Sequence, residues 1–253
     1  MEIKRNRKEK LLWISQSSYF TSVLQRSQMQ DSKPISTPIA TGTKLAKYLE
    51  GEDTLTDVTE YQQLVGYLMY GMLATRPDLA FPIALTSQYC AQPTATHLNV
   101  VKRSLRYIQR TKGFGLVFDG KEELKLECYC DADWGNGEDR KSISGWVFKL
   151  AGGAVDWGAR KQVSTALSST EAEYMALSEA VKSSIWIRNL LQELGIKAIA
   201  DAEVIYEDNQ GTIALAHNPA YHARTKPIDI HYHFVRERWK KDLWISDTVL
   251  PRI

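Results

Sequence analysis

Three carboxylates stand at positions from which they could act together. Asp131 ends an alternating run of apolar and polar residues, Glu173 lies near the start of a long helix-like segment, and Asp208 ends a short apolar run. Strand ends and helix starts are where a sheet presents groups to a crevice, so carboxylates there can converge. Converging carboxylates raise one another's pKa unless a divalent cation neutralises them. A set without histidine or cysteine favours the hard cation Mg²⁺.

Chance and helix electrostatics offer a plainer explanation of the same three residues. A chain with 30 Asp and Glu residues places some of them at strand ends by chance. A glutamate near a helix start is also favoured by the helix dipole alone. The pattern by itself therefore leaves two hypotheses, a metal site and ordinary surface charges.

The residues from 59 to 110 are predicted to form three helices with no strand between them. Apolar residues recur every four positions from 64 to 72, and the pattern breaks at Arg76 because the following proline disfavours helical geometry. The second helix is expected from 78 to about 90 and the third from 95 to 110. This half of the chain is therefore expected to be mainly α.

Two segments before these helices are predicted to be less regular. The first thirty residues hold a basic, turn-like stretch and then an apolar, helix-like one that reaches Leu24. Residues 32–58 contain Pro34 and Pro38, which disfavour helix, and they carry no lasting hydrophobic period. They are expected to form a linker or an extended surface segment.

After Gly113 the hydrophobic period changes to two, which is typical of strands. The chain is then expected to form three strands, a long helix, a fourth strand and a shorter helix, over residues 124–130, 144–150, 154–157, 169–195, 204–207 and 209–217. Gly152 and Gly153 suit a hairpin turn, and Ser169 or Thr170 suits the N-cap of the long helix. This order is typical of an α/β fold with a mixed sheet.

The composition is that of an ordinary soluble globular protein. The chain has 253 residues, enough for two modest domains, with 43% hydrophobic and 25% charged residues. No apolar run reaches the ~18 residues of a membrane span, and the charged start is not followed by the apolar segment of a signal peptide. No membrane partner is expected, and an intracellular protein is the default. The net charge of +2 does not by itself indicate nucleic-acid binding.

Several further residues have a plain explanation beside a functional one. Cys128 and Cys130 share a strand face, which favours small buried hydrophobes over a disulfide or a zinc site. His231 and His233 could suggest a metal pair, although packing or hydrogen bonding explains them more simply. The tryptophans of the second half are expected mainly in the core, with stacking on nucleic acid as the alternative, at Trp134, Trp146, Trp157 and Trp186.

Long sequence blocks surround the three acids in a fixed order. They are Cys130-Asp-Ala-Asp-Trp134 and the segments 139–148, 153–157, 161–174, 185–188, 208–210, 217–219 and 224–229. These blocks resemble the ribonuclease H of copia-type retrotransposons. Upstream blocks resemble the segment that follows the polymerase palm in the same polyproteins, at 29–34, 36–38, 65–70, 75–78 and 105–108. The resemblance therefore covers nearly the whole chain.

The resemblance implies an α/β chain of two domains. Residues 1–117 would be the mainly helical C-terminal segment of a reverse transcriptase, thumb- or connection-like. Residues 118–253 would be a ribonuclease H-like mixed β-sheet flanked by helices. The polymerase palm would precede Met1 in the parent Pol polyprotein and is an implied partner. The implied location is the cytoplasm, in virus-like particles, with a nuclear phase as a further option.

The resemblance also implies which acids are catalytic and hold metal. They fall on Asp131, Glu173 and Asp208, which would bind two Mg²⁺ ions, with Mn²⁺ as a substitute. Asp131 is preferred over Asp133 because the family's first acid directly follows its strand. Glu173 is preferred over Glu171 because the family's acid precedes a Tyr-Met-Ala-Leu run. Glu171 is interpreted as a solvated charge of the first helical turn.

The implied reaction is hydrolysis of the RNA strand of an RNA–DNA hybrid. RNA would be selected through its 2′-hydroxyl groups, and the basic helix 102–110 would hold the duplex through phosphates. Substrate contacts are expected from Ser168, Ser169, Thr170, Gln210, Arg224 and Lys226.

The end of the sequence supports a different hypothesis. The family has a fourth acid in a final helix, and this sequence stops at Ile253, where that region should begin. A truncated domain could be a weakly active or non-catalytic remnant that binds nucleic acid without cleaving it. A chain that never folds stably is the third possibility, since the missing helix would leave apolar surface exposed.

Overall fold

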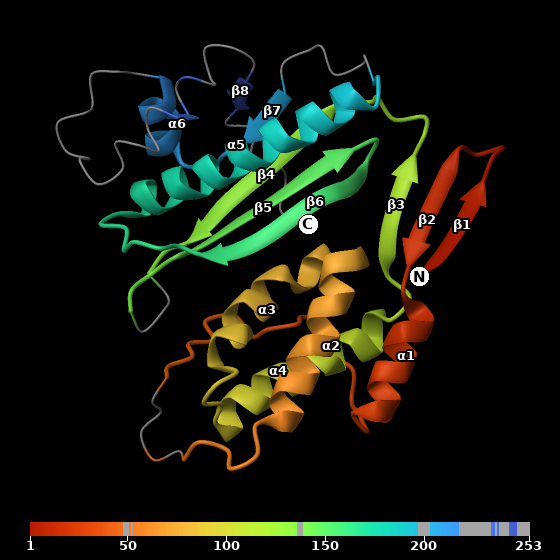
Figure 1. Cartoon of the computed structure of the whole chain (residues 1–253), viewed down its shortest axis with the longest axis vertical. Helices are drawn as coiled ribbons and strands as arrows, with labels where there is room; N and C mark the ends of the chain where they lie inside the picture. Colours follow the sequence, from red (N-terminus) through yellow and green to blue (C-terminus); the bar gives the residue numbers. More distant parts are fainter. Residues whose placement is uncertain are drawn as a thin grey trace. The chain divides into compact units, whose positions relative to one another are not determined.

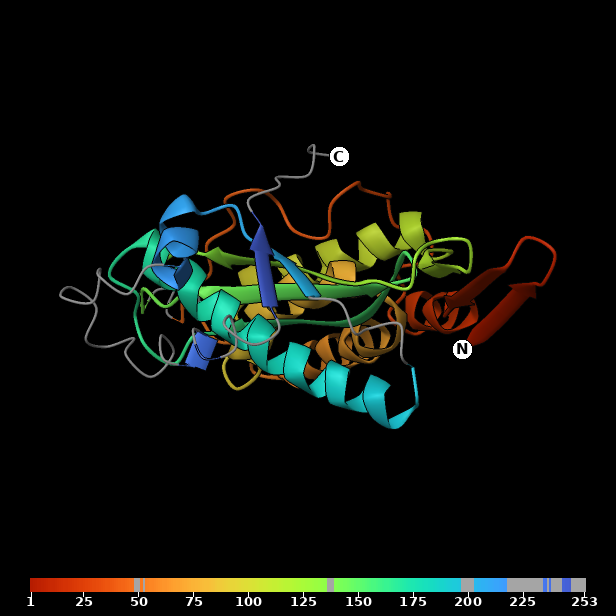
Figure 2. The same ribbon diagram turned by 90° about the horizontal axis from the view of Figure 1, so that it is seen from above.

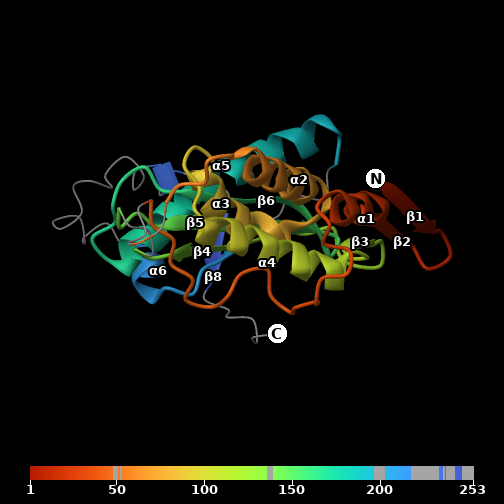
Figure 3. The same ribbon diagram turned by 90° about the horizontal axis from the view of Figure 1, so that it is seen from below.

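A computed structural model of the protein describes most of the chain. The described residues are 1–47, 51, 53–135, 139–196, 203–217, 234–235, 237 and 243–246. They form two compact units, Met1–Asp119 and Gly120–Ile253. Figures 1, 2 and 3 show the elements of each unit from three directions. No helix among the described residues is long and apolar enough to cross a membrane.

The described residues of the first unit form four α-helices that share one core. They are α1 (Ser17–Arg26), α2 (Thr59–Thr75), α3 (Ala80–Thr86) and α4 (Ala95–Thr111). Short 3₁₀ turns flank α3, at Pro77–Leu79 and Ser87–Tyr89. The core is built around Phe20, Leu68 and Leu105, all buried. The predicted helix 78–90 is therefore α3 with a 3₁₀ turn at each end.

A three-stranded sheet completes the first unit and was not predicted. Its order is β1-β2-β3, antiparallel throughout, over Glu2–Asn6, Leu11–Ser15 and Gly115–Asp119. Only the turn between β1 and β2 agrees with the turn-like prediction for the basic N-terminal segment. The alternation is hidden because β1 is an exposed edge strand that carries Lys4 and Arg5. The second partner of β2, strand β3, is also remote in sequence, so no local signal reports that pairing.

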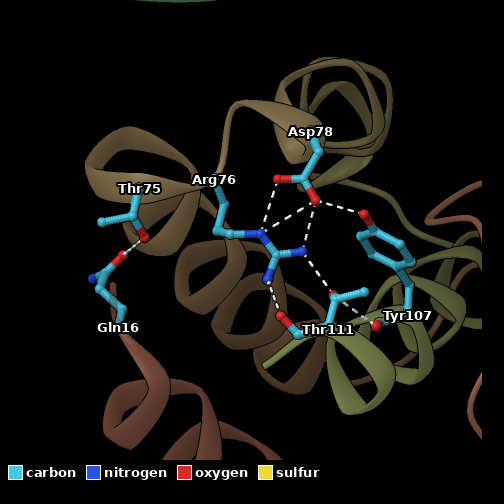
Figure 4. A network of polar contacts seen from close by, with 6 residues as sticks. All are labelled: Gln16, Thr75, Arg76, Asp78, Tyr107 and Thr111. Atoms are coloured by element: carbon cyan, nitrogen blue, oxygen red, sulfur yellow. Dashed lines mark hydrogen bonds and ion pairs between the residues drawn. The ribbon is translucent and has the colours of Figure 1, made fainter. Parts of the chain in front are cut away.

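Buried Arg76 connects the end of α2 to the end of α4. Its guanidinium group donates to Asp78 at 2.6 Å, to the hydroxyl group of Thr111 at 2.8 Å and to the carbonyl group of Thr111 at 3.0 Å (Figure 4). Tyr107 donates its hydroxyl group to the same Asp78 carboxylate at 2.7 Å. Each nitrogen of this buried guanidinium group therefore has a hydrogen-bond partner, as a buried charge requires.

Residues 33–38 of the segment before α2 are hydrogen-bonded to α4. Arg103 donates to the hydroxyl group of Thr37 at 2.9 Å, and Arg106 donates to the carbonyl group of Lys33 at 2.8 Å. Ser104 donates to the carbonyl group of Pro38 at 3.0 Å. Two of the cations assigned to duplex phosphates in the sequence thus hold the chain's own backbone and side chains.

Two glycines of α2 provide a matched test of this packing. A Cβ at Gly71 would lie 2.7 Å from Cε1 of Phe20 and closer still to Cζ, whereas a Cβ at exposed Gly66 meets nothing within 4 Å. Gly71→Ala is expected to lower the free energy of unfolding by about 1–3 kcal/mol through overpacking. Gly66→Ala should raise it by up to about 1 kcal/mol, the helix-propensity gain. Urea unfolding measures both, and equal effects of the two changes would contradict the packing at Phe20.

The second unit is a five-stranded mixed sheet covered by helices. The strand order is β6-β5-β4-β7-β8, over Gly153–Lys161, Ile143–Leu150, Leu126–Asp133, Glu203–Tyr206 and Leu243–Ser246. β4, β5 and β6 are antiparallel, while β7 pairs in parallel with β4 and with β8. The long helix α5 (Ser169–Glu193) crosses one face of the sheet, and α6 (Gln210–His217) follows β7 (Figure 2). The predicted mixed α/β fold is confirmed, and β8 is an additional strand.

The core of the second unit lies between β4 and α5. Alternate residues of β4 are buried, and Cys128 and Cys130 pack with Tyr174 and Leu177 of α5. Both cysteines are buried thiols on one face of the strand. This packing fixes α5 over β4, and so fixes where the first turns of α5 stand relative to the end of that strand.

Candidate metal centre

The parallel register of β4 and β7 brings two of the three acids to one edge of the sheet. Tyr129 pairs with Tyr206, and their rings stack with centroids 4.7 Å apart. Asp131 comes two residues after the first tyrosine and Asp208 two residues after the second. Because the strands are parallel, both carboxylates stand at the carboxyl edge of the sheet, where ligands usually bind.

The third acid is placed by the capped start of α5. The N-cap is Ser168, whose hydroxyl group accepts the Glu171 backbone N–H at 3.2 Å, rather than Ser169 or Thr170 as predicted. Glu171 in turn accepts the Leu167 backbone N–H at 2.7 Å. Glu171 is only 7% exposed, so its interpretation as a solvated charge is wrong. Glu171 therefore holds the loop that enters the helix, one residue before the N-cap.

Hydrogen bonds join the starts of α5 and α6. Asn209 caps α6 by accepting the Thr212 backbone N–H at 3.0 Å, and it accepts the Thr170 hydroxyl group at 3.3 Å. Thr212 donates to the Thr170 carbonyl group at 3.1 Å. A Cβ on Gly211 would lie 2.8 Å from the Thr170 hydroxyl oxygen, so glycine permits the close approach. Asp208 is therefore held near the helix turn that carries Glu173.

Carboxylate oxygens of Asp131, Glu173 and Asp208 lie within 4.8 Å of one another. Asp131 and Asp208 are exposed, whereas Glu173 is 7% exposed and its Oε2 atom accepts no hydrogen bond from the part of the chain that the structure describes. Burial, and after it the negative charges of Glu207 and Asp131, raises the pKa of Glu173 to about 9. A buried oxygen without a partner among three converging hard donors fits a divalent cation such as Mg²⁺.

Glu207 is a further carboxyl group at this edge that was not predicted from the sequence, and unlike Asp131 and Asp208 it is buried. One oxygen accepts the Asn209 backbone N–H at 3.1 Å, and the other accepts the Cys130 thiol at 3.4 Å. Burial raises its pKa to about 7, although the Asn209 and Cys130 hydrogen bonds act against the shift. Ile205 is buried two residues before Glu207, and residues two apart on a strand share a face. This alternation is the signal that could have identified Glu207 as buried.

The structure gives positions for only some of the predicted substrate residues. Ser168 and Ser169 are exposed at the start of α5, Thr170 is half-buried, and Gln210 is exposed at the start of α6. They stand at the same edge as the acids, since the helix starts are joined there. The other predicted residues lie outside the described part of the chain, namely Arg224, Lys226, His231 and His233.

The tryptophans of the second unit differ in how far they are buried. Trp146 packs against the core and donates to Asp156 at 3.0 Å. Trp134 and Trp186 are 52% and 60% exposed, so the prediction of core positions is wrong for both. Trp134 follows β4 directly, and its ring nitrogen donates to the Ala166 carbonyl group at 3.5 Å. Hydrophobicity does not reveal which face of an element a tryptophan occupies, and two of these rings lie on solvent faces.

Strand order and acids together define the class of the second unit. Three antiparallel strands are followed by a helix and a strand that joins β4 in parallel, and the carboxylates meet at the carboxyl edge. This arrangement is that of a ribonuclease H-like α/β domain.

Sequence comparison gives the family. The chain is 42% identical over 243 residues to the retrovirus-related Pol polyprotein from transposon TNT 1-94 of Nicotiana tabacum, a match that covers 94% of the chain. It is 40% identical over 228 residues to the Pol polyprotein from transposon RE1 of Arabidopsis thaliana, covering 90% of the chain. The chain belongs to the copia-type retrotransposon Pol polyproteins. It spans 18% and 15% of the length of these two relatives.

Solved structures give weaker likenesses. A ribonuclease H1, LC11, isolated from compost matches with a TM-score of 0.37 at 16% identity, over 49% of this chain and 84% of its own. A foamy viral protease–reverse transcriptase in complex with double-stranded DNA matches with a TM-score of 0.49 at 12% identity, over 82% of this chain and 34% of its own. No protein-family profile matches the sequence.

Proposed function

We propose that the second unit is a ribonuclease H that hydrolyses the RNA strand of RNA–DNA hybrids during reverse transcription. The observation that carries the proposal is the meeting of Asp131, Glu173 and Asp208 within 4.8 Å at one sheet edge. Membership in a Pol family supports the substrate class, because two relatives are named as retrovirus-related Pol polyproteins. The first unit is the tail of the reverse transcriptase, whose palm would be supplied by the rest of the polyprotein.

The acids at this edge of the sheet would have different roles. Mg²⁺ held by the three carboxylates would supply a metal-activated water and a charge that steadies the leaving oxygen. Asp131 and Asp208 are exposed, so a phosphodiester can approach them from solvent. One oxygen of Asp131 accepts the Ala132 backbone N–H at 2.9 Å, which fixes the carboxylate at the strand end. Buried Glu173 closes the site from the protein side.

Exposed polar groups beside the acids are suited to reading the RNA strand. Ser169 and Gln210 lie at the starts of α5 and α6, where backbone N–H groups and helix dipoles also attract phosphates. A hydroxyl and an amide group can both donate to and accept from a 2′-hydroxyl group. Recognition of that group would distinguish RNA from DNA at the cleaved position.

Trp134 is expected to contribute to hybrid binding. Its half-exposed ring is held by Ala166 directly beyond the strand end that carries Asp131. Trp134→Ala is expected to weaken hybrid binding about tenfold, the loss of one stacking or sugar contact. Trp186→Ala is the matched control, because this similarly exposed ring lies thirteen residues beyond Glu173 on α5, roughly 20 Å away. Binding measured by fluorescence anisotropy in EDTA should separate the two, and equal losses would contradict the role of Trp134.

A strand-selective cleavage assay tests the proposed function. The whole chain is incubated with Mg²⁺ and an RNA–DNA hybrid labelled on each strand, beside RNA–RNA and DNA–DNA duplexes. Cleavage confined to the RNA of the hybrid, and stopped by EDTA, is the expected result. Binding of the hybrid without cleavage would overturn the catalytic proposal and leave a nucleic-acid-binding remnant. Cleavage of all three duplexes would overturn the substrate class.

A further inference from the structure

Glu207 is buried at the point where the two acid-bearing strands end. It is 2% exposed, and it lies between the last residues of β4 and the start of α6. Its hydrogen bonds go in two directions, to the Asn209 backbone N–H at 3.1 Å and to the Cys130 thiol at 3.4 Å. A buried carboxyl group is costly unless hydrogen bonds satisfy it, and these two bonds satisfy both oxygens of Glu207.

The two partners of Glu207 are neighbours of the site acids. Cys130 immediately precedes Asp131, and Asn209 immediately follows Asp208. One carboxyl group therefore connects the side chain of the residue before one acid to the backbone N–H of the residue after the other. Asn209 is itself bonded to Thr170 of α5, so the connection extends to the helix turn that carries Glu173.

Glu207 is not one of the three converging acids. Among the described residues, the carboxylate oxygens that meet within 4.8 Å belong to Asp131, Glu173 and Asp208. Both oxygens of Glu207 already accept hydrogen bonds from the protein. This pattern is typical of groups behind a metal site, which orient the ligands without touching the ion.

We propose that Glu207 is a positioning residue that sets the separation of Asp131 and Asp208 by bridging Cys130 and Asn209. This inference rests on the proposed metal site of the second unit. The charge of Glu207 is secondary to its two hydrogen bonds. A glutamine can accept the Asn209 N–H through its carbonyl oxygen and donate its amide group to the sulfur of Cys130. Alanine removes both contacts.

The test compares Glu207→Gln and Glu207→Ala with the wild-type chain. Mn²⁺ alone is the probe, and electron paramagnetic resonance measures its affinity for the whole chain without any substrate. Glu207→Ala is expected to weaken Mn²⁺ binding about tenfold to a hundredfold, the usual effect of removing an orienting group. Glu207→Gln should stay within about fivefold of wild type. Glu193→Ala, an exposed acid at the end of α5, controls for net charge and should leave the affinity unchanged.

Three outcomes would overturn the proposal. Glu207→Ala with wild-type Mn²⁺ affinity would make Glu207 a purely structural residue. Glu207→Gln as weak as Glu207→Ala would show that the charge acts directly, as in a ligand. A wild-type chain that binds no Mn²⁺ would remove the site that Glu207 is said to position.

One further variant and one further outcome complete the test. If Glu207→Ala does not fold, Cys130→Ala removes only one of the two contacts and is expected to weaken Mn²⁺ binding severalfold. A wild-type chain that binds Mn²⁺ but leaves the hybrid intact would overturn the proposed hydrolysis alone. The Mn²⁺ comparison would still decide the role of Glu207, because it does not depend on cleavage.

Discussion

Glu173→Gln is expected to abolish hybrid cleavage while stabilising the metal-free protein. Cleavage should fall by about 10³-fold or more, because the change removes a charged metal ligand and leaves a neutral one. Stability should change in the opposite direction, because burial and neighbouring charges raise the pKa of Glu173 to about 9 from an ordinary value of 4.5. The ionised carboxylate therefore destabilises the folded state, and glutamine removes that cost.

The size of this stabilisation depends on pH. A carboxyl group with a raised folded-state pKa binds its proton more tightly in the folded chain than in the unfolded chain. Its contribution to stability is therefore lost as pH rises from about 4.5 towards 9. In EDTA at pH 8, Glu173→Gln should raise the free energy of unfolding by about 1 kcal/mol or more. Near pH 4 the gain should vanish, since wild-type Glu173 is then protonated.

Asp133→Asn is the matched control for lost activity. Asp133 is the last residue of β4, two positions beyond Asp131, and it is not among the three acids that converge. Its cleavage rate is expected to remain within about fivefold of wild type, since only changes in groups that meet the transition state cost large factors. Inactivity of Asp133→Asn together with activity of Glu173→Gln would contradict the assignment of the site.

Arg76→Met is expected to be the most destabilising single change in the first unit. Removing one partner of a buried ion pair costs about 3–5 kcal/mol, because the groups left behind lose their hydrogen bonds. Here the carbonyl and hydroxyl groups of Thr111 lose a donor, and Asp78 loses its closest cation (Figure 4). The ring of Phe20, 5.5 Å from the guanidinium carbon, also loses a contact.

The measurement is urea unfolding of the whole chain, beside Arg110→Met. Arg110 is exposed near the end of α4, and Arg110→Met removes the same charge as Arg76→Met. Its free energy of unfolding should therefore stay within about 0.5 kcal/mol of wild type. Arg76→Lys should recover little stability, because an ammonium group cannot form the forked contacts of a guanidinium group. A loss below about 1 kcal/mol for Arg76→Met would show that the network contributes little to folding.

The elements around the site were predictable from local pattern. β4 alternates buried and exposed residues, and α5 begins at Ser169 and ends at Glu193, close to the predicted span. The three acids could be selected because each was expected to end a strand or begin a helix, although β4 continues to Asp133, two residues beyond Asp131. Their convergence follows from the parallel pairing of β4 and β7, which the α/β order of elements favours.

Other features depend on contacts that sequence periodicity does not encode. β2 pairs with β3 across about a hundred residues, so this pairing has no local signature. Glu171 and Glu207 look like surface charges in the sequence. In the structure each is buried and accepts a hydrogen bond from a backbone N–H group. Trp134 lies directly beyond the end of β4, and its side chain is 52% exposed. Burial of polar groups is decided by tertiary partners rather than by residue type.

The site is most directly tested by locating a bound metal. Crystals of the whole chain would be soaked in Mn²⁺, and anomalous scattering recorded near the manganese absorption edge. The predicted result is an anomalous peak bounded by the carboxylates of Asp131, Glu173 and Asp208, whose oxygens already lie within 4.8 Å of one another. The peak should disappear in Glu173→Gln crystals. A peak elsewhere on the chain, with these three carboxylates uncoordinated, would contradict the account.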